Sequence, residues 1–256
     1  MPRLSKNQKK LILLFLKMGF SLKRISSFLG FGKTTIYYYY RKIKSRKYKE
    51  PIYRINYSRR EGEIVGIFTG DGSQYYYKNY GHYHTNVHFG DVLAYVEHVK
   101  SLYEGYFNKK WRIWRQVKDE GFISYRLRVI DKKIYFHFFN YIIYDPRSKS
   151  DTVRLRTLKL PRSFKIGFIK GLIDTDGWVA KNGKEIGFCT TSERLAKQVM
   201  ILFKEFNIES KLRLEHRPKP RKTMFIIRVS RKSVDNFLNL IKPYKALKLG
   251  AGNSAR

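Results

Sequence analysis

The chain has 256 residues, enough for one or two globular domains and a small appendage. Hydrophobic residues make up 43% of it, which excludes disorder throughout, and a formal net charge of +34 indicates a polyanionic partner, with nucleic acid the leading candidate. One cysteine, Cys189, excludes a disulfide framework and a zinc site built from several cysteines. No apolar run approaches the ~20 residues of a membrane span and no signal-peptide pattern opens the chain, so we expect a cytoplasmic protein.

The most basic part of the chain is its beginning, where residues 1–60 hold 17 Lys and Arg but only one acid, Glu50. Ser5 is a suitable N-cap for a first helix, in which Leu11, Leu14, Phe15 and Met18 recur at helical spacing. The sequence therefore predicts that these four side chains form the inner face of that helix.

Two further short helices are expected before residue 48. Ser21 can cap the second, Gly30-Phe31-Gly32 can form a tight turn, and a basic polar helix should run from about Lys33 to Ile43. Helix, short helix, glycine turn and basic helix is the order of a helix-turn-helix.

The run Ser21, Ile25, Leu29, Gly30, Lys33, Thr35, Ile36 and Tyr37 resembles the small DNA-binding domains of resolvases and transposases. The groove-facing side of the third helix would then consist of Lys33, Thr34, Thr35, Tyr37 and Arg41. Ile36, Tyr40 and Ile43 would pack inward. The alternative is a basic three-helix bundle that serves only for packing.

The remainder of the chain contains an internal repeat with a period of about 100 residues. Ile64–Gly72 and Ile169–Gly177 open the two copies, each with a helix that ends in Asp-Gly. Each copy continues with two strands, an amphipathic helix, two strands and a last helix. The expected elements are 73–89, 91–107, 111–130 and 134–143 in the first copy and 178–189, 192–206, 211–229 and 234–241 in the second, with Asp91 and Ser192 as helix caps and Asn182-Gly183 as a two-residue hairpin turn.

This pattern predicts an α+β fold with two pseudo-symmetric αββαββα half-domains and an all-α N-terminal domain. The expected division is a helix-turn-helix at 1–48, a basic linker at 49–60, a first half-domain at 61–145, a linker at 146–160, a second half-domain at 161–245 and a tail at 246–256. Because one chain holds both halves, we expect a monomer.

The two acidic motifs are expected to meet. Gly66 and Gly70, like Gly167 and Gly171, are four residues apart, which allows two helix backbones to approach closely and brings Asp71 and Asp176 side by side. Carboxylates at helix C-termini repel the helix dipole and each other, and a divalent cation such as Mg²⁺ removes both objections. Two such ions about 4 Å apart could clamp a phosphodiester.

Other interpretations of these motifs are weaker. A solvated Asp-Gly helix end is common for one motif, but it does not explain two copies within a repeat. An EF-hand is disfavoured because Gly177 follows Asp174-Thr175-Asp176 at loop position 4, where the loop needs its glycine at position 6. His82, His84 and His88 are close in sequence but lack a second ligand cluster, which argues against a zinc site.

Residues 60 to about 245 resemble the single-chain, two-motif LAGLIDADG homing endonucleases. The second motif departs only at Lys170 and the first at Thr69. The resemblance implies a saddle-shaped pair of sheets on a long DNA target, and hydrolysis of both strands that leaves 3′ overhangs.

The same resemblance implies a set of site residues. Asp71 and Asp176 would bind Mg²⁺ together with the carbonyl groups of Gly70 and Thr175, and Lys132 and Lys232 would be the supporting catalytic lysines. Mn²⁺ would substitute for Mg²⁺, while Ca²⁺ would support binding without cleavage.

Strand alternation predicts which side chains face DNA. Tyr125 and Leu127 lie on one apolar face, so their neighbours point the other way, and Leu212 and Leu214 are expected inward. Mixed Arg, Lys, Gln, Asn and His on a sheet face suits base-edge hydrogen bonding, although a solvated charged face is the alternative for each residue. The expected DNA contacts are Lys78, His84, Asn86, His88, Arg112, Trp114, Gln116, Lys118, Ser124, Arg126, Arg128, Lys211, Arg213, Glu215, Arg217 and Arg228.

Competing functions remain open at this stage. The fold could serve an RNA maturase that binds intron RNA, or a regulator that binds DNA without cutting it. A structural nucleic-acid protein, such as a ribosomal component, would suit the charge but does not need paired acidic helix ends. An intein is disfavoured because the chain begins Met-Pro-Arg and ends Asn-Ser-Ala-Arg, without splicing residues.

Overall fold

The computed structural model describes residues 4–44, 55–117, 121–218 and 220–246. The chain forms two compact units, residues 1–51 and 52–256. None of the helices among the described residues has the length and hydrophobicity needed to span a lipid bilayer.

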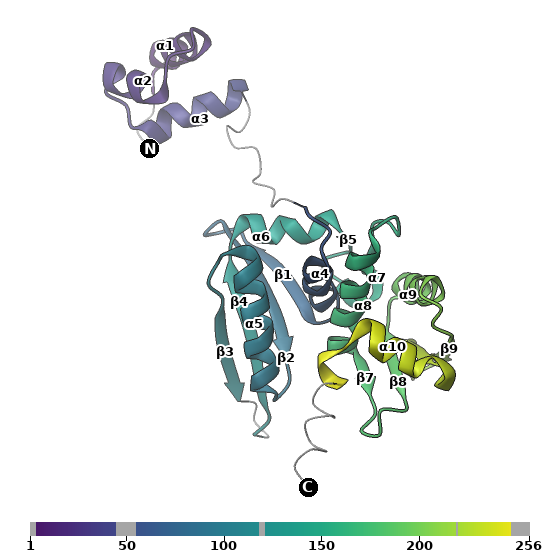
Figure 1. Ribbon diagram of the computed structural model, residues 1–256. Coiled ribbons are helices and arrows are strands. Elements are labelled where there is room, and N and C mark those ends of the chain that lie inside the picture. The colour runs from purple at the N-terminus through teal and green to yellow at the C-terminus, as the bar shows by residue number, and fades with distance from the viewer. Residues whose placement is uncertain (1–3, 45–54, 118–120, 219, 247–256) are drawn as a thin grey trace. The chain divides into compact units, whose positions relative to one another are not determined.

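The N-terminal unit consists of three helices, α1 (Lys6–Lys17), α2 (Leu22–Leu29) and α3 (Lys33–Lys44) (Figure 1). Ser5 caps α1 in a capping box with Gln8, and Ser21 caps α2 by accepting a hydrogen bond from the amide of Arg24. Gly30 ends α2 with φ +68°, a left-handed conformation that glycine adopts without strain. The expected order of three helices is therefore present.

The inner face of the N-terminal unit differs from the expected one. Ile12, Leu16, Ile25 and Ile36 are buried, whereas Leu11, Leu14 and Met18 are 40%, 52% and 61% exposed. The buried stripe of α1 is shifted by one residue because its sequence is apolar on nearly every side from 11 to 16, and periodicity alone cannot select a face. Ile43 is also exposed, and Tyr39 packs on this core beside Tyr40.

The second unit repeats one order of elements twice. The first half-domain contains α4 (Arg59–Asp71), β1 (Gly72–Tyr77), β2 (His82–Phe89), α5 (Leu93–Phe107), β3 (Arg112–Val117), β4 (Ile123–Ile130) and α6 (Lys132–His137). The second contains α8 (Arg162–Asp176), β7 (Gly177–Val179), β8 (Ile186–Thr190), α9 (Glu193–Glu205), β9 (Ser210–Glu215), β10 (Met224–Val229) and α10 (Val234–Ile241), with a 3₁₀ turn η2 (Arg231–Ser233) before α10. Between them lie η1 (Phe138–Asn140), β5 (Ile142–Ile143), α7 (Lys149–Thr152) and β6 (Arg154–Leu155).

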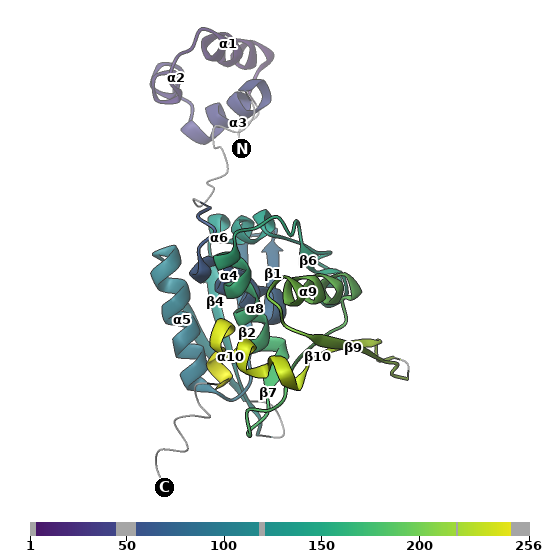
Figure 2. The ribbon, with the colours of Figure 1, turned by 45° about the vertical axis from the view of Figure 1, so that its right-hand side comes forward.

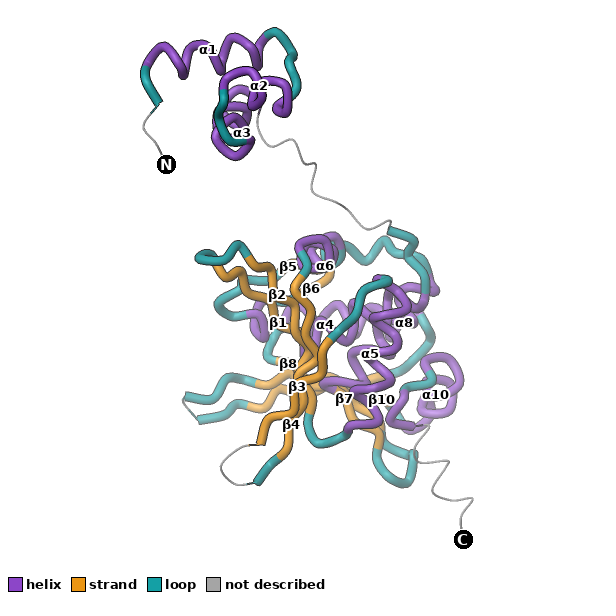
Figure 3. The backbone as a smooth tube through the Cα atoms, turned by 90° about the vertical axis from the view of Figure 1, so that its left-hand side faces the viewer, coloured by secondary structure: helices purple, strands orange, loops and turns teal. Residues whose placement is uncertain are grey.

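The two antiparallel sheets have the same topology, β1-β2-β4-β3 and β7-β8-β10-β9. This equivalence confirms the predicted α+β fold with two pseudo-symmetric half-domains. Figure 2 shows α5 beside the first sheet and α9 and α10 beside the second, and Figure 3 follows the strands through both halves.

The two motif helices, α4 and α8, pack along each other between the sheets (Figure 1). A Cβ added at Gly66 would lie 2.2 Å from the carbonyl oxygen of Phe168, and one at Gly171 would lie 2.4 Å from that of Glu63. Both positions therefore require glycine, because a side chain would overlap the partner backbone. The two helices end at Asp71 and Asp176, on the same level.

Several element boundaries differ from expectation. Val92 rather than Asp91 is the N-cap residue of α5, and it provides no side-chain cap. The hairpin between β7 and β8 is closed by the amide of Ala180 on the carbonyl of Glu185, so its loop is longer than two residues. The last helix of the first half-domain ends at His137, because Ile142 and Ile143 leave it to pair with β6.

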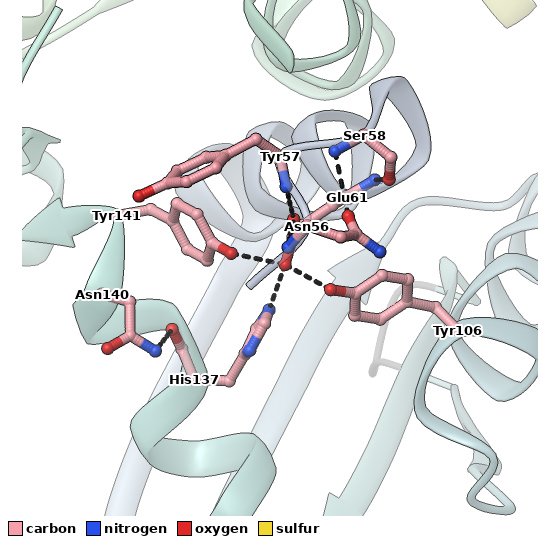
Figure 4. A network of polar contacts seen from close by, with 8 residues as sticks. All are labelled: Asn56, Tyr57, Ser58, Glu61, Tyr106, His137, Asn140 and Tyr141. Carbon is pink, nitrogen blue, oxygen red and sulfur yellow. Dashed lines mark hydrogen bonds and ion pairs between the residues drawn. The ribbon is translucent and has the colours of Figure 1, made fainter. Parts of the chain in front are cut away.

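A buried carboxylate fixes the start of α4 (Figure 4). Glu61 is fully buried, and its Oε2 accepts hydrogen bonds from the amides of Asn56 and Tyr57 at 3.1 and 2.6 Å. Its Oε1 accepts from the hydroxyls of Tyr106 and Tyr141. These bonds tie the chain that enters the second unit to α5 and to the segment after α6.

Candidate functional site

The candidate catalytic site lies where α4 and α8 end. A Cβ added at Gly70 would lie 3.1 Å from Asp176 Oδ2 and 2.2 Å from Thr175 Oγ1, so the Asp176 carboxylate lies against the end of α4. Asp71 and Asp176 are both partly buried and interact electrostatically. Close helix packing thus brings together two acids that are about 100 residues apart in the sequence.

Burial and mutual repulsion disfavour the charged state of this pair. Burial and, to a smaller extent, the neighbouring Asp176 raise the pKa of Asp71 to about 7, while Lys149 and Lys245 oppose the shift. Burial also raises the pKa of Asp176, again against the same two lysines. Near neutral pH the two carboxylates therefore favour a proton or a cation between them.

Two lysines that sequence analysis did not identify reach this site. Lys149 Nζ donates to the carbonyl oxygens of Thr69 at 2.7 Å and Gly70 at 3.0 Å. Lys245 Nζ donates to those of Thr175 at 3.1 Å and Gly177 at 2.6 Å. Each motif helix therefore has one ammonium group at its negative end, where the helix dipole favours a cation.

Burial lowers the pKa of Lys149 to about 8, although Asp176 and Asp71 pull it upward. The pKa of Lys245 is lowered for the same reason, with Asp174, Asp71 and Asp176 opposing. Lys149 follows Ile143, the last residue of the expected first copy, by six residues, and Lys245 follows Ile241, the last of the second, by four. This shared position after each copy is the signal that could have identified them.

The lysines expected from the resemblance lie elsewhere. The sheet register aligns Gly72 with Leu127 through Val87, and Lys132 is five residues beyond Leu127, ~16 Å along a strand. Its Nζ lies 5.6 Å from the rings of Tyr83 and Phe136.

The second half-domain repeats this arrangement. Gly177 aligns with Ile227 through Phe188, and Lys232 is five residues further on, in η2. The register therefore does not bring Lys132 or Lys232 to the aspartates, because a strand and its turn separate both lysines from the motif ends.

Lys170 and Thr69, the residues at which the two motifs depart from the usual pattern, both form specific contacts. Lys170 Nζ contacts Glu63 Oε1 at 2.5 Å, an ion pair between α8 and α4. Burial acts to raise the pKa of Glu63, but hydrogen bonds from His98 and Lys170 lower it overall. Thr69 Oγ1 donates to the carbonyl of Val65 at 2.7 Å within its own helix.

The donor set fits a hard divalent cation. Asp71 and Asp176 supply carboxylate oxygens, and the carbonyls of Gly70 and Thr175 adjoin them, although both accept hydrogen bonds from lysines. Each carbonyl oxygen has two lone pairs, so a hydrogen bond leaves one for a metal ion. Among the described residues, no group of three or more His, Cys, Asp and Glu side chains forms another candidate metal site.

The first sheet presents a polar outer face opposite its core. Arg126 Nη2 donates to Gln116 Oε1 at 3.0 Å, and the Arg128 guanidinium lies 5.9 Å from the Trp114 ring. Ser124 and Arg112 extend the same face through their partners Gln116 and Arg128. The predicted strand alternation is present in this sheet.

Two predicted DNA contacts of the first sheet are covered by their neighbours. His84 and Asn86 are only 3% and 2% exposed. The Tyr75 ring stacks on His84 at 4.4 Å, and Arg128 Nε donates to His84 Nδ1 at 3.0 Å. His84 therefore lies beneath the surface that Tyr75 and Arg128 present. His88 remains exposed and contacts Ser73 Oγ at 2.9 Å.

The second sheet has a less polar outer face. Lys211, Arg213 and Arg228 lie on it, together with Ile226 and Cys189 in register. Leu214 lies on the opposite face, where it was expected to be buried, but it is 49% exposed.

The remaining predicted DNA contacts are dispersed. Glu215 pairs with Arg217 at 2.8 Å, and Lys78 lies exposed in the β1–β2 turn. Lys118 lies outside the described residues. In the N-terminal unit, Lys33, Thr34 and Arg41 are exposed, Thr35 and Tyr37 are partly exposed, and the Tyr37 ring stacks on Tyr40 at 6.2 Å.

Two central, close-packed helices that end in paired acids, each followed by a four-stranded sheet, define the LAGLIDADG fold. A family profile described as a LAGLIDADG-like domain matches residues 163–242. No curated protein sequence matches the chain.

Solved structures with similar folds include homing endonucleases. The I-DmoI complex with DNA and Mn has a TM-score of 0.56 and 21% identity, over 73% of this chain and 97% of that one. Mesophilic variants of I-DmoI have a TM-score of 0.55 and 19% identity, over 75% of this chain and 99% of that one. I-WcaI bound to its DNA recognition sequence has a TM-score of 0.51 and 17% identity, over 75% of this chain and 84% of that one.

Proposed function

We propose that this protein is a site-specific homing endonuclease that cuts both strands of a long double-stranded DNA target and leaves 3′ overhangs. The observation that carries the proposal is the site itself, in which Asp71 and Asp176 meet at the ends of α4 and α8, each beside a lysine. The likeness to structures described as homing endonucleases in complex with DNA supports it.

Asp71 and Asp176 would hold Mg²⁺, with the carbonyls of Gly70 and Thr175 as further ligands. When bound, the cation supplies positive charge to the phosphodiester oxygens. The raised pKa of Asp71, about 7, supports this assignment, because a buried acid pair without a cation is unfavourable. Mn²⁺ should substitute, and Ca²⁺ should support binding without cleavage.

Lys149 and Lys245 serve the reaction from opposite sides. Their ammonium groups are fixed by main-chain carbonyls, so they can donate hydrogen bonds to phosphate oxygens or orient a water molecule without reorganisation. One lysine at the end of each motif helix, next to the pair of aspartates, suits a reaction that is performed twice, once on each DNA strand.

The outer faces of the two sheets would bind the two halves of the target. On the first sheet, Arg126, Arg128 and Gln116 can form hydrogen bonds with base edges, while exposed lysines on both halves contact phosphates. The N-terminal unit would act as a helix-turn-helix that contacts flanking DNA with α3. A single chain with both half-domains would act as a monomer.

The test is a cleavage selection from a randomised or genomic DNA library, performed with Mg²⁺ and with Ca²⁺. Recovery of one long site that is cut only with Mg²⁺ is the expected result. A site that is bound but never cut in either ion would contradict the proposal and favour a DNA-binding regulator. Intron RNA bound in preference to any DNA would favour a maturase.

A further inference from the structure

The chain after α10 crosses from the second half-domain to the first. Lys242 ends α10 with φ +52°, and the following Pro243 is buried. The Tyr244 ring lies 4.7 Å from His98 and 5.0 Å from Tyr95, both on α5. Residues 242–246 thus connect α10 to α5, and we term them the C-terminal clasp.

Asp174 holds the main chain of the clasp. Its Oδ1 accepts a hydrogen bond from the amide of Lys245 at 3.1 Å, and the side chain is only 3% exposed. Its Oδ2 is buried and has no hydrogen-bond partner within the described part of the chain. A buried carboxylate whose second oxygen lacks a donor is costly, which argues that the Lys245 contact has a function.

The side chain of Lys245 returns from this anchor to the catalytic site. Its Nζ contacts the carbonyls of Thr175 and Gly177, on either side of Asp176. Asp174 therefore fixes the backbone of the residue whose ammonium group lies beside the second catalytic carboxylate. Asp174 interacts with the main-chain amides of the clasp, at Lys245 and at the neighbouring Tyr244, so its effect on the site would pass through Lys245.

The first half-domain has no equivalent acid. The corresponding motif position is Thr69, whose hydroxyl bonds within α4. Lys149 does not need such an anchor, because it begins α7 inside a connection that is held at both ends. There the amide of Asp145 donates to Thr152 Oγ1 at 2.8 Å, and Ser192 Oγ donates to the carbonyl of Val153 at 2.7 Å. The two lysines thus differ in how their main chain is held, Lys149 by bonds at both ends of α7 and Lys245 by Asp174.

We propose that Asp174 is a positioning residue that anchors the C-terminal clasp and thereby holds Lys245 beside Asp176. Lys245 bonds to the carbonyls on either side of Asp176 and Lys149 bonds to those just before Asp71, while both ammonium groups interact electrostatically with both carboxylates. The cut made at the Asp176 side therefore depends more strongly on this anchor than the cut made at the Asp71 side. Loss of Asp174 therefore converts a double-strand endonuclease into an enzyme that preferentially nicks one strand. This inference rests on the proposed function.

The test compares Asp174→Ala with Asp174→Asn, whose amide oxygen can still accept from the Lys245 amide. The probe is the selected DNA target with each strand labelled separately, cut in Mg²⁺. Asp174→Ala should slow one strand by about 10- to 100-fold and leave the other within about 2-fold, so that nicked DNA accumulates. Asp174→Asn should restore most of the lost rate, and DNA affinity in Ca²⁺ should stay within about 2-fold.

Two further variants separate positioning from general damage. Lys245→Met should produce the same strand bias, and adding Asp174→Ala to it should cause no further loss. Thr69→Ala, at the matched motif position, should leave the ratio of the two strand rates unchanged. Equal slowing of both strands by Asp174→Ala, or additive losses in the double variant, would overturn the proposal.

A measurement without DNA distinguishes failure of this inference from failure of the proposed function. In Asp174→Ala the amide of Lys245 should exchange hydrogen faster than in the wild type, while Asp174→Asn should retain protection. Unchanged protection in Asp174→Ala would refute the anchor even if the enzyme cuts DNA. If Asp174→Ala loses the protection of the Lys245 amide but the wild type cuts no DNA, the anchor is supported and the endonuclease proposal is refuted.

Discussion

At the scale of single residues, the site consists of charged groups that would be energetically unfavourable away from water without a neighbour of opposite charge. Asp71 and Asp176 are carboxylates at negative helix ends, and Lys149 and Lys245 are ammonium groups withdrawn from water. Each group is tolerated because the opposite charge is nearby. Such an arrangement costs stability and provides a place for a cation and a phosphate.

Asp71 should lower the stability of the metal-free protein as pH rises. Its pKa is about 7 in the folded chain against 3.8 in the unfolded chain, so the folded state binds more protons between these values. The contribution of protonated Asp71 to the free energy of unfolding is therefore fully present below pH 3.8 and is lost as pH rises through 7. Asp71→Asn should raise the thermal midpoint in EDTA at pH 8, by about 2–4 °C for each kcal/mol recovered, and by less at pH 5.

The control for this prediction is Asp235→Asn, which changes an exposed acid in the first turn of α10. Asp235→Asn should change the thermal midpoint only slightly, and by nearly the same amount at pH 5 and at pH 8. A gain from Asp71→Asn that is equal at pH 5 and pH 8 would contradict the raised pKa.

The two lysines of the site should matter more than the two expected from the resemblance. Lys149→Met and Lys245→Met should each slow cleavage of the selected target by about 100-fold, because each removes a fixed donor beside a reacting phosphate. Lys132→Met and Lys232→Met, on the same fold but ~16 Å along the strands, should change the rate by less than about 3-fold. The opposite ranking would return the catalytic role to Lys132 and Lys232.

At the scale of elements, the paired motif helices position the site. Their glycines set the distance between α4 and α8, and that distance brings the two aspartates together. The sheets that follow each helix begin at Gly72 and Gly177, directly after the acids. A change in the helix interface should therefore affect folding and the site together.

Gly171→Ala should destabilise the protein strongly. The added methyl group would lie 2.4 Å from Glu63 O and 2.5 Å from Ile67 N, both rigid backbone atoms. Overpacking of this kind costs ~1–3 kcal/mol or more in the free energy of unfolding, measurable by urea denaturation. Gly90→Ala is the matched control, since no atom lies within 4 Å of the added carbon. A loss below ~0.5 kcal/mol for Gly171→Ala would contradict the close helix contact.

Sequence periodicity predicted most helices and strands. It failed where tertiary contacts determine which side chains are buried. The bounds of α10 match because its apolar side chains recur on one clear face, whereas α1 is apolar on several sides and its buried stripe was misplaced. The burial of His84 beneath Tyr75 depends on cross-strand stacking. Lys149 and Lys245 were missed because their role comes from chain segments that return to the motif ends from outside the repeat.

At the scale of the whole molecule, the chain has two units and a net charge of +34. Under the proposed function, the two units would divide DNA binding and cleavage between them. The second unit contains the complete paired-acid site. The N-terminal unit contributes a separate three-helix core and an exposed basic side of α3.

Deletion of residues 1–51 should therefore weaken DNA binding without abolishing cleavage at saturating protein. Fewer phosphates would be neutralised, so the plot of log affinity against log salt should become less steep by ~0.9 for each lost phosphate contact. The measurement is affinity for the selected target in Ca²⁺ over a salt series. An unchanged slope would exclude the N-terminal unit from the DNA interface.

Strand cleavage of the selected target by Asp71→Asn and Asp176→Asn, with binding measured in parallel in Ca²⁺, tests whether the paired carboxylates are the catalytic centre. We expect each variant to lose double-strand cleavage by at least about 100-fold while it still binds the target. Normal double-strand cleavage by either variant would show that the paired carboxylates at the ends of α4 and α8 are not the catalytic centre.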